Sequence, residues 1–278
     1  MCRLYGFRAS EATKVECTLV HAQNALMVQS QSDQAGKSHA NGWGMVSFDG
    51  RVPHVERQAW AAYHGEHFRR AAGRIYAKQV LAHVRRATVG EPTLANTHPF
   101  LDGGWALIHN GTIPNLDRVR PLLLAQLPEH RRAAITGDTD SEHVLQLLRA
   151  MQDRQPARPS LDILDAMIGM IARWCHEIDP SARLGLNLLV TDGRQMIGSC
   201  LGRPLHFVER RGVHDCEICG FPHIHHKPRH AYRAVVIASE PISHEEWHEV
   251  PDGSVYRIDP DYRLELRSFA LGNERSSG

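Results

Sequence analysis

Two long helical segments lie in the middle of a chain whose remainder consists mainly of short strand-like segments. Residues 160–177 place apolar side chains at helical spacing, and residues 138–151 open with the acidic and hydroxyl side chains typical of a helix start. Segments with strand patterning lie at 2–8, 43–48, 79–88, 104–109, 184–191, 195–201, 204–210, 232–239, 254–258 and 262–268. Strands, then helices, then strands predict an α+β fold with layered sheets.

The same patterns predict shorter elements and one continuous domain. Residues 64–77 and 115–126 are expected to be helical, and Asp49-Gly50 is a turn signal after the strand 43–48. The polar segment 152–159 contains proline, but composition does not change across it. We therefore expect it to be a loop within a single domain of residues 1–278.

Charge and hydropathy exclude several classes of protein. Lys and Arg number 32 against 31 Asp and Glu, and this balance argues against a dedicated nucleic-acid binder. The sequence contains no apolar run of the ~18 residues that a membrane helix needs, and the first residues do not resemble a secretory signal. Six cysteines are too sparse for a disulfide framework. We expect a cytoplasmic protein with neither nucleic-acid nor membrane partners.

Cys2 becomes the first residue if Met1 is removed. Its α-amine would then lie beside the thiol and titrate near ~8, so one residue could supply both a nucleophile and a proton acceptor. The alternative is a small buried residue at the start of a strand. Position alone does not decide between these two interpretations.

Three further positions carry groups suited to an amino-acid substrate. The amide of Asn110 and a backbone N–H at Gly111 could stabilise an oxyanion, although Asn-Gly is also a strong hairpin-turn signal. Arg85 could grip a carboxylate and Asp140 an ammonium group. The alternatives are a surface ion pair for Arg85 and a helix cap for Asp138 or Asp140.

Together these residues form an ordered set of motifs, Met1-Cys2-Arg3-Leu4, His83-Val84-Arg85-Arg86-Ala87-Thr88, His109-Asn110-Gly111-Thr112 and Gly137-Asp138-Thr139-Asp140-Ser141-Glu142. The set resembles the class II (type 2) glutamine amidotransferases of the N-terminal nucleophile (Ntn) hydrolase superfamily, in particular their small stand-alone members. This resemblance implies a four-layer αββα sandwich with two antiparallel sheets.

The resemblance also implies hydrolysis of the γ-amide of glutamine, or of a γ-glutamyl amide, through a glutamyl thioester on Cys2. Cys2 would be the nucleophile and Asn110 with Gly111 the oxyanion hole. No cofactor would be required for this catalysis.

Substrate binding would fall to Arg85 for the α-carboxylate, with Thr88 at the pocket edge, and to Asp140 for the α-ammonium group. Arg86 and Val89 depart from the pattern of larger members. Two alternatives stay open. The chain could donate ammonia to a separate synthase partner, or it could be a catalytically inactive metal-binding or regulatory module.

A Cys- and His-rich insertion at about 211–230 lies outside these motifs. Cys216 and Cys219 form a Cys-x-x-Cys pair followed by several histidines, and with His223 and His225 they could bind a structural zinc ion. His226 and His230 are further candidates. A redox pair, a solvated loop or two unligated thiols are the alternatives.

Overall fold

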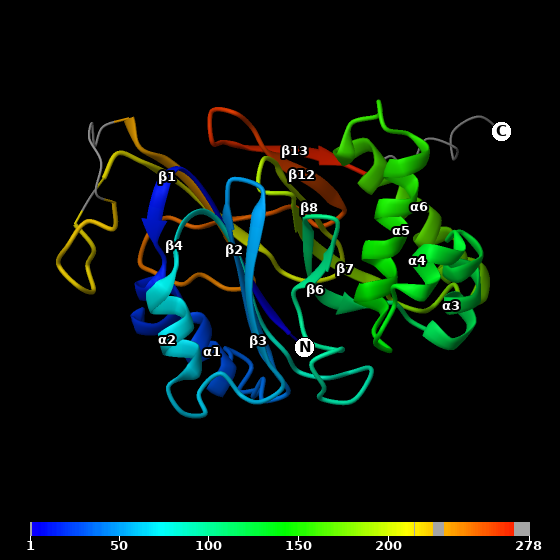
Figure 1. The fold of residues 1–278 in the computed structure, drawn as a ribbon, viewed down its shortest axis with the longest axis horizontal. Helices are drawn as coiled ribbons and strands as arrows, with labels where there is room; N and C mark the ends of the chain where they lie inside the picture. Colours follow the sequence, from blue (N-terminus) through cyan, green and yellow to red (C-terminus); the bar gives the residue numbers. More distant parts are fainter. Residues whose placement is uncertain (1, 214, 225–230, 270–278) are drawn as a thin grey trace.

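The computed structural model describes residues 2–213, 215–224 and 231–269, and it contains two stacked antiparallel β-sheets with helices on both outer faces (Figure 1). The predicted α+β class and the αββα layering are confirmed.

The first sheet has seven strands and contains both the beginning of the chain and the Cys/His-rich connection. Its strand order is β11 (His248–Glu249), β9 (His206–Arg211), β10 (Arg233–Ala238), β1 (Arg3–Lys14), β4 (Tyr76–Val84), β2 (Trp43–Asp49) and β3 (Val52–Gln58). All pairs are antiparallel, with Arg3 opposite Val84 and Tyr5 opposite Ala238. The amino-terminal strand therefore occupies the middle of the sheet.

The second sheet has six strands. Their order is β13 (Leu264–Ser268), β12 (Ser254–Ile258), β8 (Met196–Cys200), β7 (Gly185–Thr191), β6 (Trp105–Thr112) and β5 (Phe100–Asp102). Asn110 lies opposite Asn187 in the β6–β7 pair. The Asn110-Gly111 pair thus belongs to a strand, and the hairpin-turn alternative for it is wrong.

Two groups of helices cover the outer faces (Figure 1). Against the first sheet lie η1, a π-helix (Cys17–His21), α1 (Leu26–Gln31) and α2 (His67–Arg74). Against the second lie α3 (Leu116–Ala125), α4 (Glu129–Ala133), α5 (Asp140–Arg154) and α6 (Ser160–Ile178). In the described residues, no helix is long and apolar enough to cross a membrane.

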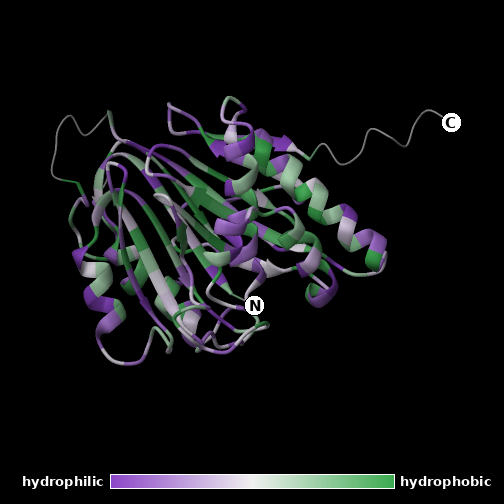
Figure 2. Cartoon of the chain, turned by 45° about the vertical axis from the view of Figure 1, so that its right-hand side comes forward, coloured by the Kyte–Doolittle hydropathy of each residue, from purple (hydrophilic) through white to green (hydrophobic). Residues whose placement is uncertain are grey.

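Three hydrophobic cores fill the three interfaces between the four layers. On β1, Tyr5 and Phe7 face the helices, whereas Leu4 packs between the sheets with Ile108 and Leu189. This alternation follows from the two-residue period of a strand, and it requires both faces of each sheet to be apolar. Figure 2 accordingly shows the central strands rich in hydrophobic residues.

Several boundaries differ from the sequence prediction. The first strand extends to Lys14, and the helix expected at 64–77 begins only at His67 because Gly65 adopts a φ of +68°. The strand expected at 79–88 ends at Val84, after which the chain turns out of the sheet. The short elements β3, β5, β11, α1 and α4 and the π-helix were not predicted.

Candidate active site

Three strand ends of the first sheet meet at one edge. Cys2 immediately precedes β1 and Arg85 immediately follows β4, and the Arg3–Val84 register makes them neighbours. Ser239 follows β10 and exchanges backbone and side-chain hydrogen bonds with Leu4, at 3.1 and 3.0 Å. The antiparallel order of these strands brings together residues that are far apart in the sequence.

Arg3 fixes the segment that carries Cys2. Its guanidinium donates to Asp33 Oδ2 at 2.5 Å, to Glu240 Oε1 at 2.7–2.9 Å and to the Cys2 carbonyl at 3.1 Å. Both carboxylates are buried, so the pairing is shielded from water and holds the start of β1 in place. Sequence reasoning missed this clamp because its partners lie 30 and 237 residues away.

The Cys2 thiol is half-buried and lies 3.6 Å from the Arg86 carbonyl, to which it donates. Burial raises the pKa of this thiol, and the Arg86 hydrogen bond and the Arg85 charge only partly oppose the shift. The thiol is therefore protonated near neutral pH and needs a nearby base to become a nucleophile.

Asn110 reaches the same edge from the second sheet. Its Nδ2 donates to Ser239 Oγ at 3.3 Å, which links it through Ser239 to Leu4 of β1. The side chain is buried, and its Oδ1 has no hydrogen-bond partner among the described residues. One amide hydrogen therefore remains for a ligand.

Gly111 is required by packing between strands. A Cβ atom at this position would lie 2.0 Å from the Gly185 carbonyl oxygen of β7. The backbone of the neighbouring strand β7 thus packs directly against Gly111, and its role as an oxyanion donor stays a prediction.

Asp140 is the first residue of α5 and is held in a fixed orientation. Its Oδ2 accepts from the Ile113 N–H at 2.9 Å, and its Oδ1 lies 3.2 Å from the Ser141 hydroxyl. The N-cap is Thr139, whose side chain makes no capping bond. The helix-cap alternative for Asp140 is therefore wrong: this buried carboxylate bridges α5 to the end of β6.

Arg85 is bonded mainly to the backbone of the following loop. Nη2 donates to the carbonyls of Val89 and Gly90 at 2.7 and 2.9 Å, and Nη1 donates to Glu91 at 3.1 Å and Asn41 at 3.5 Å. A surface ion pair is excluded, because the side chain is buried. Carboxylate binding by Arg85 stays a prediction, and it would require exchange of some of these bonds.

Thr88 is exposed, and its hydroxyl lies 3.4 Å from that of Thr112 at the end of β6. It therefore borders the strand that carries Asn110.

Asn96 holds the adjoining loops together, donating to the Glu91 carbonyl at 3.1 Å and accepting from the Asp138 N–H at 2.8 Å. Sequence reasoning did not single out Asn96, because its role depends on loops that meet only in the fold.

A cavity of about 940 Å³ lies elsewhere, beyond the other end of β1, where Cys17, Arg210 and Tyr232 are among its lining residues. We assign the chemistry to the Cys2 edge and not to this cavity. The Cys2 edge combines a thiol, an oriented amide donor and a buried carboxylate, which together match the needs of an amide-cleaving reaction.

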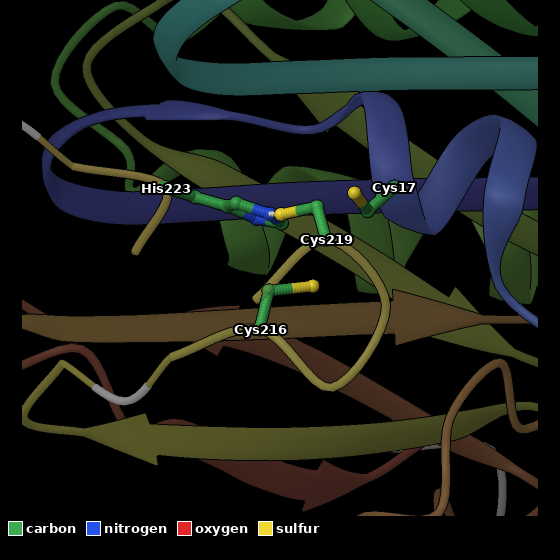
Figure 3. A group of neighbouring side chains, drawn as sticks. All are labelled: Cys17, Cys216, Cys219 and His223. Carbon is green, nitrogen blue, oxygen red and sulfur yellow. Dashed lines mark hydrogen bonds between the residues drawn. The ribbon is translucent and has the colours of Figure 1, made fainter. Parts of the chain in front are cut away.

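A second group of chemically reactive side chains lies near that cavity. Cys17, Cys216, Cys219 and His223 point toward one another (Figure 3), and their ligand atoms all lie within 4.8 Å of one another. The sequence predicted Cys216, Cys219 and His223 but chose His225 as the fourth member, and His225 lies outside the described residues. Cys17 was missed because it is 199 residues from Cys216 in the chain (216 minus 17).

The family model for class-II glutamine amidotransferases matches residues 1–260. The chain belongs to this family. Relatives matched over most of their length are named as a hydrolase and as glutamine amidotransferases, and the chain is accordingly an amide-hydrolysing enzyme.

Relatives of similar length exist. The chain is 29% identical over 263 residues to a γ-glutamyl-hercynylcysteine sulfoxide hydrolase of Mycobacterium tuberculosis (strain CDC 1551 / Oshkosh), covering 93% of both chains. It is 25% identical over 307 residues to a probable glutamine amidotransferase of Saccharomyces cerevisiae (strain ATCC 204508 / S288c), covering 93% of this chain and 82% of that protein.

Solved structures share the fold. A glutamine aminotransferase class-II domain protein from Silicibacter pomeroyi aligns with a TM-score of 0.64 at 16% identity, over 98% of this chain and 100% of that one. The glutamine phosphoribosylpyrophosphate amidotransferase of B. subtilis aligns with a TM-score of 0.62 at 18% identity, over 98% of this chain and 50% of that one.

Proposed function

We propose that the protein hydrolyses a γ-glutamyl amide, with Cys2 as nucleophile after removal of Met1. The observation that carries this proposal is the convergence of Cys2, Asn110 and Asp140 from two sheets and a helix start onto one edge. A γ-glutamyl group offers a carbonyl carbon to Cys2, a developing oxyanion to Asn110 and an ammonium group to Asp140.

In the first half-reaction, the α-amine of Cys2 accepts the thiol proton and Cys2 Sγ bonds to the γ-carbonyl carbon. The oxyanion so formed accepts a hydrogen bond from the free N–H of the Asn110 amide, with the Gly111 backbone N–H as the second predicted donor. Collapse of this intermediate breaks the C–N bond. The leaving amine takes the proton from the α-ammonium of Cys2, and a glutamyl thioester remains.

In the second half-reaction, water attacks the thioester while the Cys2 amine accepts one of its protons. The C–S bond breaks, the sulfur regains a proton from the ammonium, and glutamate leaves. The raised pKa of the Cys2 thiol fits this scheme, because a protonated thiol requires the adjacent amine.

We further propose that the leaving group is an amine larger than ammonia. The support is the similarity over 93% of both chains to a relative named as a γ-glutamyl-hercynylcysteine sulfoxide hydrolase. We assign Asp140 to the α-ammonium and Arg85 to the α-carboxylate of the glutamyl group, with Thr88 at the pocket edge. The thiols of the described cysteines are all free, which suits a reducing cytoplasm.

The mass of the intact protein and a substrate panel test this function. We expect Met1 to be absent, and we expect glutamate release from γ-glutamyl amides with a higher kcat/KM than from glutamine. Cys2→Ala should abolish release with every substrate. Normal turnover by Cys2→Ala, or full activity with Met1 retained, would refute the role of the Cys2 thiol and amine.

The same panel distinguishes an ammonia-donating subunit. Such a protein would use glutamine and no other γ-glutamyl amide. Its activity would be stimulated strongly by a synthase that co-purifies from the source cells. Preference for substituted γ-glutamyl amides without any partner is the result we expect from the hydrolase.

A further inference from the structure

The four side chains of Figure 3 come from two segments of the chain, η1 and the connection between β9 and β10. Cys17 begins η1, Cys216 and Cys219 lie in the connection between β9 and β10, and His223 follows four residues later. Cys219 Sγ and His223 Nε2 are 3.4 Å apart, and all four ligand atoms lie within 4.8 Å of one another. Three sulfurs and one imidazole nitrogen thus surround a common centre.

We propose that Cys17, Cys216, Cys219 and His223 bind one structural Zn²⁺ ion. Zinc bonds of ~2.3 Å to sulfur and ~2.0 Å to nitrogen form a tetrahedron whose edges are roughly 3.5–3.8 Å, so only small side-chain shifts are needed. Three thiolates and one histidine are a closed ligand set that selects zinc over harder cations such as Mg²⁺.

The backbone around the Cys-x-x-Cys pair already has the shape of a metal-binding turn. The Ile218 N–H points at Cys216 Sγ at 3.4 Å, where it can stabilise a thiolate. Gly220 closes the turn with a φ of +74°, and its N–H donates to the Cys216 carbonyl at 2.8 Å. The turn therefore orients the first two sulfurs before any metal binds.

Among the described residues, the turn buries little apolar surface at its tip. Ile218 and Phe221 are 43% and 72% exposed, and neither belongs to a hydrophobic core of the described residues. By contrast, Ile224 is buried, and the His223 carbonyl accepts from the Lys14 N–H at 3.0 Å beside the end of β1. A metal ion joining Cys17 to this turn would supply the stabilisation that side-chain burial does not.

The zinc site is separated from the catalytic chemistry. Cys2 and Cys17 flank opposite ends of the twelve-residue strand β1, which spans roughly 35 Å at ~3.3 Å per residue. The ion would clip the β9–β10 connection to the end of β1 and would take no part in amide cleavage. This inference does not depend on the proposed function.

Metal analysis by mass spectrometry of protein purified without an affinity metal tests the site. We expect about one equivalent of zinc per chain, with X-ray absorption showing three sulfurs and one nitrogen around it. Cys17→Ser should lower the zinc content more than tenfold. His225→Asn should leave it unchanged, and so should Cys175→Ala, a control at a buried cysteine of α6.

If Cys17→Ser does not fold, Cys219→Ser provides the same test, because Cys219 is exposed in the turn. A wild-type protein without zinc, whether its thiols are free or joined in a disulfide, would overturn the proposal. Zinc lost in His225→Asn but retained in Cys17→Ser would overturn the assignment of Cys17. Hydrolase activity retained after zinc loss is the expected sign of a structural site.

Discussion

Ser239 links the nucleophile strand to the proposed oxyanion donor, so Ser239→Ala tests whether that link matters. The Ser239 hydroxyl accepts from the buried Leu4 N–H at 3.0 Å and from Asn110 Nδ2 at 3.3 Å. Alanine removes both bonds but keeps the backbone bond to the Leu4 carbonyl. The substitution therefore releases Asn110 without removing it.

The expected losses of stability and of kcat in Ser239→Ala follow from these contacts. Leaving the Leu4 N–H unpaired costs about 1–3 kcal/mol, and losing the longer Asn110 bond costs about 0.5–1.5 kcal/mol. We expect a loss of about 2–4 kcal/mol in the free energy of unfolding. Complete removal of an oxyanion donor typically lowers kcat by about 10²–10³-fold, so a released but present Asn110 should lower kcat by roughly tenfold.

Steady-state kinetics with the best γ-glutamyl amide and urea unfolding measure both effects. Asn110→Ala should lower kcat more than Ser239→Ala does, with KM little changed in either. When Ser239→Ala is added to Asn110→Ala, kcat should fall by less than about twofold further, because the effect of Ser239 acts through Asn110. Ser254→Ala is the control: its buried hydroxyl bonds only to the Pro251 carbonyl among the described residues.

The positioning role of Ser239 would be refuted if the double variant lost kcat by the product of the losses measured in Ser239→Ala and Asn110→Ala alone. A tenfold loss of kcat in Ser254→Ala would also refute it, since this would show that removing a buried hydroxyl without a bond to Asn110 lowers activity equally.

Three further predictions concern substrate binding and pH. Asp140→Asn should raise KM for γ-glutamyl substrates by about tenfold or more, as expected for a lost charge-assisted bond; an unchanged KM would exclude ammonium binding by Asp140. Arg85→Lys should lower Tm, because one ammonium cannot replace bonds to four carbonyls, and should also raise KM; a lower Tm with KM unchanged would leave Arg85 only its loop-holding role. Burial lowers the pKa of His39 to about 4 from an ordinary value near ~6.5. Between these two pH values the unfolded chain binds more protons than the folded one. The free energy of unfolding should therefore fall as pH drops through this window, by up to about 3 kcal/mol. Urea unfolding at pH 7 and pH 4.5 should show a smaller pH effect in His39→Gln, and an equal effect in both proteins would contradict the assignment.

The sequence by itself determined the fold class and the order of the main elements. Apolar strand-like segments lie on both sides of two long helices, and the central strands, such as β4, β6 and β7, are buried along most of their length. The motifs that contain Cys2, Asn110 and Asp140 also indicated the family, which the family model over residues 1–260 confirms.

Only the tertiary structure decided what those residues contact. Asn110 bonds to Ser239, Arg3 to Asp33 and Glu240, and Cys17 lies beside Cys216, in each case across a long stretch of sequence. Such contacts depend on which strands become neighbours in the sheets, and local patterns carry no information about that choice. For the same reason, the motif around Cys2 is visible in the sequence, whereas the ion pairs by which Arg3 holds this segment in place are visible only in the structure.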